Sequence, residues 1–132
     1  MAGHKYSVEF RVFSETLDPA QISRELGLQP CQMRMKGQRV GRKPNKEGMW
    51  AYNGGRESAE WDSLSEGLSF VLKKLWPHRK TIAGYGANGK FIWWCGHFQS
   101  SFDGGPSLSA PLLKKLGEFG AELYLDNYFS EK

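Results

Sequence analysis

The chain has 132 residues, of which 39% are hydrophobic and 14% aromatic, and this composition predicts one folded domain over residues 1–132 and excludes a disordered chain. The net charge is +4, from 18 basic and 14 acidic residues. No run approaches about 18 consecutive apolar residues and the first residues lack the apolar run of a signal peptide, so we expect a cytoplasmic protein without a membrane span. Cys31 and Cys95 are too few and too far apart to predict a disulfide framework or a paired metal site.

The first part of the chain predicts a strand, a helix and a second strand. Between Lys5 and Ser14 apolar residues alternate with polar ones, which is the pattern of a half-buried strand. A helix is expected to begin after Asp18, whose side chain can accept from free backbone amides, and to end at Gly27. We expect a second strand from about Cys31 to Lys36.

A long basic loop is predicted at about residues 37–48, where glycine, proline and asparagine interrupt regular structure. The window from Arg34 to Lys46 contains six cations and no acid, whereas the rest of the chain has 12 basic and 14 acidic residues. The six cations are Arg34, Lys36, Arg39, Arg42, Lys43 and Lys46. Such a cluster is either a solvated loop or a surface that attracts phosphates or acidic partners.

The remainder of the chain predicts three more strands and two more helices. A short strand is expected at 49–53, followed by a long helix that begins with a capping box at Ser63 and ends or is kinked at Pro77. Residues 90–99 are apolar on both faces, which is typical of a strand in the interior of a sheet. A helix capped by Ser109 and a final strand at 121–129 complete the chain.

This order of elements, β-α-β-β-α-β-α-β, predicts an α+β fold. We expect a ferredoxin-like sandwich with a five-stranded, mainly antiparallel sheet and three helices on one face. The other sheet face would then have no helical cover.

Aromatic and charged residues are expected on that uncovered face. The alternation in the first strand turns Arg11 outward, and the same pattern turns Tyr124 and Tyr128 outward on the last strand. Either Trp93 or Trp94 joins them from the strand between. A face of this kind can form a homodimer or protein interface, can be covered by the long loop, or can stack a small ligand or nucleic acid.

Enzymatic signatures are weak in this sequence. Cys95 and His97 lie two residues apart on one strand face, a spacing that suits neighbouring ligands or a nucleophile with its base. Further metal ligands at the usual spacings are missing, and a cysteine in so apolar a strand is expected to be structural. The glycine-rich segment 84–89 precedes a strand, so we interpret it as a turn and not as a phosphate loop. We expect no catalytic residue, metal or cofactor; an enzyme would have to rely on His97 and Asp103.

Several turn, cap and core signatures along the chain carry a family resemblance. They are Leu17-Asp18-Pro19, Ile22, Leu26-Gly27-Leu28-Gln29-Pro30, Lys36-Gly37, Gly48, Trp50, the long helix ending at Pro77, Gly104-Gly105, Ser107-Leu108-Ser109, Leu112-Leu113 and Leu125-Asp126. With these residues the chain resembles a family of small bacterial domains, the domain-of-unknown-function family 4279. The resemblance covers nearly the whole chain and implies an α+β domain, but it supplies no activity, cofactor or catalytic residue.

The function predicted from the sequence is that of a non-catalytic interaction or ligand-binding domain, with a homodimer or another protein as partner and no membrane. The alternative is a nucleic-acid-binding module that uses the basic loop and the aromatic sheet face. Trp50 follows the loop and is interpreted either as a core anchor or as a stacking platform. The candidate binding residues are Arg11, Arg34, Lys36, Arg39, Arg42, Lys43, Trp50, Tyr124 and Tyr128.

Overall fold

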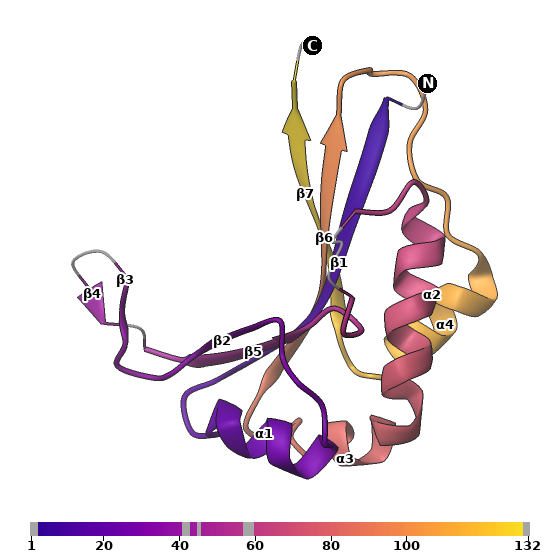
Figure 1. Ribbon diagram of the computed structural model, residues 1–132. Helices are drawn as coiled ribbons and strands as arrows, with labels where there is room; N and C mark the ends of the chain where they lie inside the picture. The colour runs from indigo at the N-terminus through magenta and orange to yellow at the C-terminus, as the bar shows by residue number, and fades with distance from the viewer. Residues whose placement is uncertain (1–2, 41–42, 45, 57–59, 131–132) are drawn as a thin grey trace.

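The computed structural model describes residues 3–40, 43–44, 46–56 and 60–130 (Figure 1). Its main sheet has the strand order β2-β5-β1-β6-β7. These strands are β1 (His4–Ser14), β2 (Gln32–Arg34), β5 (Gly48–Tyr52), β6 (Lys90–Gln99) and β7 (Glu122–Phe129). The pairs β2–β5, β5–β1 and β1–β6 are antiparallel, whereas β6 and β7 are parallel, so the sheet is mixed.

Four α-helices connect these strands: α1 (Pro19–Leu26), α2 (Leu64–Leu75), α3 (Arg79–Ala83) and α4 (Ala110–Gly117). A 3-10 turn, η1 (Trp76–His78), joins α2 to α3. The three longer helices begin with side-chain caps, since Asp18, Ser63 and Ser109 accept hydrogen bonds from backbone amides in the first turns. Helix α1 ends at Gly27, whose φ of 66° lies in the left-handed region that glycine adopts without strain.

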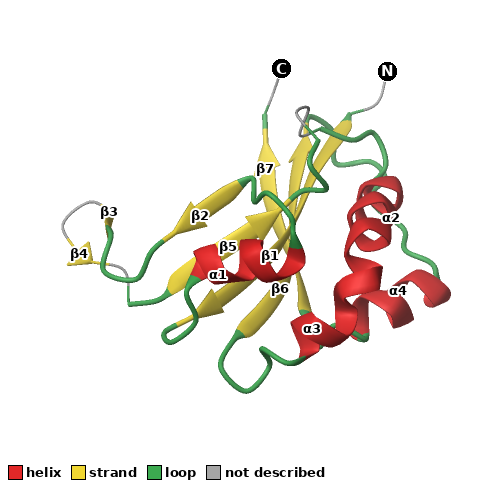
Figure 2. Cartoon of the chain, turned by 60° about the horizontal axis from the view of Figure 1, so that its bottom comes forward, coloured by secondary structure: helices red, strands yellow, loops and turns green. Residues whose placement is uncertain are grey.

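All four helices cover the same face of the sheet (Figures 1 and 2). Each contributes buried residues to one hydrophobic cluster: Ile22 from α1, Leu68 from α2, Ile82 from α3 and Leu116 from α4. The sheet contributes every second residue of its strands, because successive side chains point to opposite faces. On β1 and β6 these inward residues are Tyr6, Val8, Phe10, Val12, Phe91, Trp93 and Cys95.

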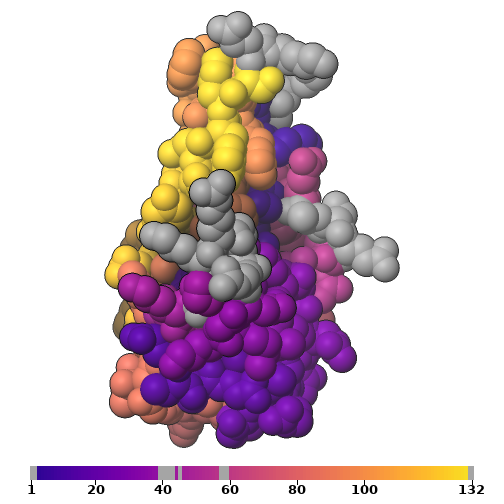
Figure 3. Space-filling model, turned by 90° about the vertical axis from the view of Figure 1, so that its left-hand side faces the viewer, coloured from indigo at the N-terminus to yellow at the C-terminus, as the bar shows by residue number. Residues whose placement is uncertain are grey.

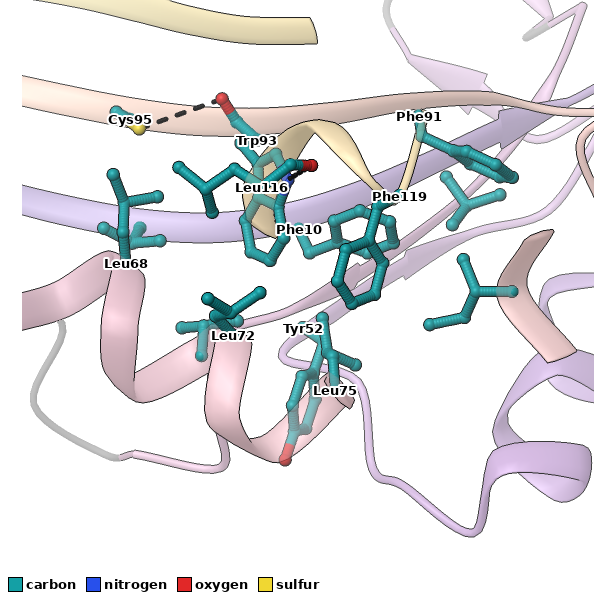
Figure 4. Close-up of a cluster of buried hydrophobic side chains, with 14 of the residues drawn as sticks. Phe10, Tyr52, Leu68, Leu72, Leu75, Phe91, Trp93, Cys95, Leu116 and Phe119 are labelled. Carbon is teal, nitrogen blue, oxygen red and sulfur yellow. Dashed lines mark hydrogen bonds between the residues drawn. The ribbon is translucent and has the colours of Figure 1, made fainter. Parts of the chain in front are cut away.

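Three aromatic rings form the centre of this core (Figure 4). Phe10 and Trp93 pack edge to face at 4.8 Å between ring centroids, and Phe119 packs against Trp93 at 5.5 Å. The indole N–H of Trp93 donates to the backbone oxygen of Leu116 at 3.1 Å, so the buried polar atom has a partner. Helix α4 is thereby tied to the middle of the sheet.

The predicted α+β class and the five strands are confirmed, while the ferredoxin-like description stays a prediction. Three details differ from the sequence-based expectation. The second strand spans only Gln32–Arg34. The long helix ends at Leu75, just before Pro77, but η1 and a fourth helix, α3, follow it, whereas the sequence predicts three helices; a proline is tolerated in the first turn of a helix. Part of the basic loop pairs as a small ribbon of β3 (Arg39–Val40) and β4 (Lys43–Pro44), since two-residue strands fit between the glycines. No helix in the described residues is long and apolar enough to cross a membrane.

Candidate interaction surface

The sheet face opposite the helices combines aromatic rings with charged groups. We call it the open face and define it by Glu9, Arg11, Trp94, Tyr124, Asp126 and Tyr128, which the strand register places on one side. On it, Arg11 Nε donates to the Glu9 carboxylate at 2.9 Å, and the Arg11 guanidinium lies 4.2 Å from the ring centroid of Trp94. Arg11 is thus held between a carboxylate and an aromatic ring. Trp94 and not Trp93 is the outward tryptophan, because Trp93 is fully buried in the core.

Strand β7 carries the most exposed part of the open face. Tyr124 is 55% exposed and Tyr128 is 46% exposed. The Tyr128 hydroxyl donates to Asp126 Oδ2 at 2.6 Å, which raises the pKa of this tyrosine, and its ring stacks on Phe98 at 5.0 Å. Both tyrosines are thus well exposed, whereas the loop-cover interpretation stays a prediction because part of the basic loop lies outside the described residues.

The backbone of β7 forms one edge of the sheet. The Ser130 amide donates to the Gln99 oxygen, so by the alternation of a parallel ladder the even-numbered residues of β7 face β6. The amides and carbonyls of Leu123, Leu125, Asn127 and Phe129 therefore point away from the sheet. The strand contains no lysine, arginine or proline, the residues that commonly protect an edge from pairing. In contrast, the opposite edge strand β2 has only three residues and includes Arg34.

Exposed apolar side chains gather along this same edge. Among the described residues, six of the nine large hydrophobic side chains that are exposed lie on β7, at the end of β6 or in the loop that follows it. They are Phe98, Phe102, Leu123, Tyr124, Tyr128 and Phe129. Phe102 and Phe129 stack at 4.3 Å between ring centroids. Figure 3 shows β7, in yellow, at the surface of the molecule.

The sheet order separates the basic residues from this edge. Arg34 and Lys36 are exposed on β2 and the turn after it, at the edge opposite to β7. Arg39, Arg42 and Lys43 are also candidate binding residues. Arg42 and the side chains of Arg39 and Lys43 lie outside the described part of the chain. Of the candidate binding residues, the structure therefore brings together Arg11, Tyr124 and Tyr128, which share the open face, and keeps Arg34 and Lys36 apart from the two tyrosines.

Trp50 is a core residue, which corrects its inclusion among the candidate binding residues. It is fully buried, and its indole N–H donates to Ser23 Oγ of α1 at 2.8 Å. Its ring stacks on Tyr52 at 5.8 Å between centroids. A buried ring enclosed in this way is not accessible to a base or to another planar ligand.

The groups considered for catalysis already have partners inside the protein. His97 is buried, with Nε2 2.8 Å from His4 Nδ1 and Nδ1 2.9 Å from the Asn127 side-chain oxygen. His4 in turn contacts the backbone oxygen of Asp103, so the chain His97–His4–Asp103 does form, but through the main chain of Asp103 and not through its carboxylate. Burial raises the pKa of the Cys95 thiol to about 12, which disfavours the reactive thiolate.

Two further features of the structure are not predicted from the sequence: the surroundings of Cys31 and the contact between His4 and His97. Cys31 is exposed and lies near Glu9 of the open face, and desolvation followed by the Glu9 carboxylate raises its thiol pKa to about 11. The contact between His4 and His97 cannot be predicted from the sequence, because no sequence pattern links residues of two strands before their pairing is known. No group of three or more potential metal ligands comes together within the part of the chain that the structure describes.

Comparison with known proteins identifies the family. The model of the family described as "Domain of unknown function (DUF4279)" matches residues 4–130. Neither the curated proteins nor the solved structures gave a match. Because the family model spans nearly the whole chain, from the first strand to the end of β7, this protein belongs to the DUF4279 family.

Proposed function

We propose that this domain is a non-catalytic interaction module that forms a homodimer by pairing its β7 edge with the β7 edge of a second copy. The observation that carries this proposal is the combination of an eight-residue unprotected edge strand with the exposed apolar residues around it. Edge strands with free amides and carbonyls pair readily with another strand, and contiguous apolar patches on folded domains mark interaction surfaces.

Antiparallel pairing of β7 with itself extends the sheet from five to ten strands across a two-fold axis. A two-fold axis at Asp126 would place two carboxylates directly opposite each other, and one at Tyr124 would place Glu122 opposite Asp126. Both arrangements are unfavourable because like charges across a strand pair repel. A two-fold axis at Leu125 or Asn127 instead places Asp126 opposite a tyrosine of the second copy. We therefore propose a register centred on one of these two residues.

Two observations support the non-catalytic part of the proposal. Both ring nitrogens of His97 have hydrogen-bond partners within the protein. The thiol of Cys95 is buried. On the open face, Arg11 is already paired with Glu9. The Glu9 and Asp126 carboxylates on that face also disfavour the alternative of nucleic-acid binding, because phosphates are repelled by nearby acids.

The experiment is light scattering coupled to size-exclusion chromatography at micromolar concentrations. The proposal predicts twice the 15.0 kDa mass of the chain. The double variant Leu123→Lys/Phe129→Lys should be monomeric, because it adds charge at two exposed edge positions. Its matched control is Met33→Lys/Met35→Lys at the far side of the sheet, which should remain dimeric.

The control suits the test because all four positions have comparable exposure, 39% and 45% for Leu123 and Phe129 against 41% and 38% for Met33 and Met35. Circular dichroism checks that each variant is folded. A mass of 15.0 kDa for the unmodified chain throughout would contradict the proposal. A dimer that persists in the β7 variant would place the interface elsewhere.

A further inference from the structure

A pocket of about 450 Å³ lies on the helical layer, between the exposed sides of α2 and α4. It is of the size that small organic ligands occupy in proteins. Its apolar wall comes from Leu72, Trp76, Pro111 and Leu112, and two cations, Lys73 and Lys115, lie beside them. The pocket is separate from β7, so what it binds does not depend on the proposed homodimer.

Trp76 connects the apolar wall with the positive charge. The indole is only partly buried, and the Arg79 guanidinium lies 4.5 Å from its ring centroid. Lys115 Nζ lies 5.7 Å from the same centroid. Arg79 is fixed in place because it also donates to the Trp76 backbone oxygen at 2.9 Å. The aromatic wall is therefore flanked by cations from two different helical segments.

No acidic residue lines the pocket in the described part of the chain. The sequence shows the same bias, because the segment from Gly67 to Phe102 has five cations and no acid. Lysines near the C-terminal ends of helices also complement the helix dipole. The helix dipole alone does not explain, however, why Lys73 on α2 and Lys115 on α4 line the same apolar pocket.

We infer that this pocket binds a small amphiphilic anion, in which a planar apolar group is joined to a single carboxylate. The apolar group would lie against Leu72, Trp76 and Leu112, and the carboxylate would lie near Lys73 and Lys115. Burial of the apolar group supplies the attraction, and the two ammonium groups select the charged ligand over a neutral one.

The probe is 2-naphthoate, with the neutral 2-naphthamide as its matched comparison. Binding is followed by chemical-shift changes of backbone amides at low-millimolar ligand. We expect naphthoate to shift amides of α2 and α4 and to bind about fivefold more tightly than the amide, as two exposed lysines would provide. Replacement of both lysines, Lys73→Gln/Lys115→Gln, should remove this preference.

Two further variants keep the test specific. Lys74→Gln/Lys80→Gln removes the same charge outside the pocket and should preserve the preference for the anion. Ser69→Met fills the pocket from an exposed position and should abolish binding without removing a charge. Equal binding of naphthoate and naphthamide, an equal loss in the Lys74/Lys80 control, or shifts confined to other parts of the chain would each overturn the inference.

Discussion

The hydrogen bond between Trp50 and Ser23 predicts a specific loss of stability when the serine hydroxyl is removed. The Trp50 indole is fully buried and its N–H donates to Ser23 Oγ at 2.8 Å, which joins β5 to α1. In Ser23→Ala this N–H loses its partner within the protein, at a cost of about 1–3 kcal/mol. Alanine recovers up to about 0.5 kcal/mol through its higher helix propensity. The expected net loss is about 1–2 kcal/mol, or a fall in Tm of about 3–8 °C.

Chemical denaturation and thermal melting of four variants measure this effect: Ser23→Ala, Ser69→Ala, Trp50→Phe and the double variant Trp50→Phe/Ser23→Ala. The matched control is Ser69→Ala, a helical serine on the exposed side of α2, which should change the stability by no more than about 0.5 kcal/mol. In a Trp50→Phe background the Ser23→Ala change should cost nothing further, because the donor has already been removed. If Ser23→Ala and Ser69→Ala have the same effect on the free energy of unfolding, the assigned role of this hydrogen bond is refuted.

Three other predictions concern individual side chains. Asp18→Ala should lower the free energy of unfolding by about 1 kcal/mol, because Asp18 Oδ1 accepts from the Ala20 amide. Asp18→Asn should retain most of this stability, since asparagine is also a good N-cap; equal losses in the two variants would show that the cap is not responsible. The Tyr85 hydroxyl donates to Glu25, and the pKa of this tyrosine is raised, mainly by burial and then by this hydrogen bond. The stability that the neutral tyrosine contributes is therefore fully present below about pH 10 and is lost as the pH rises further. Tyr85→Phe should make the decline in stability above pH 10 less steep, and an unchanged slope would contradict it. The pKa of the Cys31 thiol is raised to about 11, so its alkylation near neutral pH should be about tenfold or more slower than that of an ordinary thiol, because the smaller thiolate fraction outweighs the higher nucleophilicity of a more basic thiolate. Reaction at the ordinary rate would contradict this pKa shift.

Local features of the fold could be predicted from the sequence because they depend on neighbouring residues. The cap at Asp18 and the left-handed Gly27 are properties of a few consecutive residues, and both are confirmed. The two-sided apolar pattern of residues 90–99 likewise predicted a strand inside the sheet, and β6 does lie between β1 and β7.

The candidate surfaces could be predicted only in part, because they depend on how distant segments pack. The outward direction of Tyr124 follows from alternation, but its position at a sheet edge follows from the strand order, which no local pattern encodes. Similarly, Lys73 and Lys115 are 42 positions apart in the sequence and meet only because α2 packs beside α4. The burial of Trp50 beneath α1 is also tertiary, so a tryptophan next to a basic loop resembled a stacking platform in the sequence alone.

Hydrogen exchange of the β7 amides tests the proposed pairing most directly. Both registers compatible with charge hydrogen-bond the Leu125 and Asn127 amides to the second copy, whereas in a single chain these amides point away from the sheet. If β7 pairs in this way, both amides are protected, their protection increases with protein concentration, and it is lost in Leu123→Lys/Phe129→Lys. Fast exchange of Leu125 and Asn127 at every concentration, alongside protected amides on the β6 side of the strand, would contradict it.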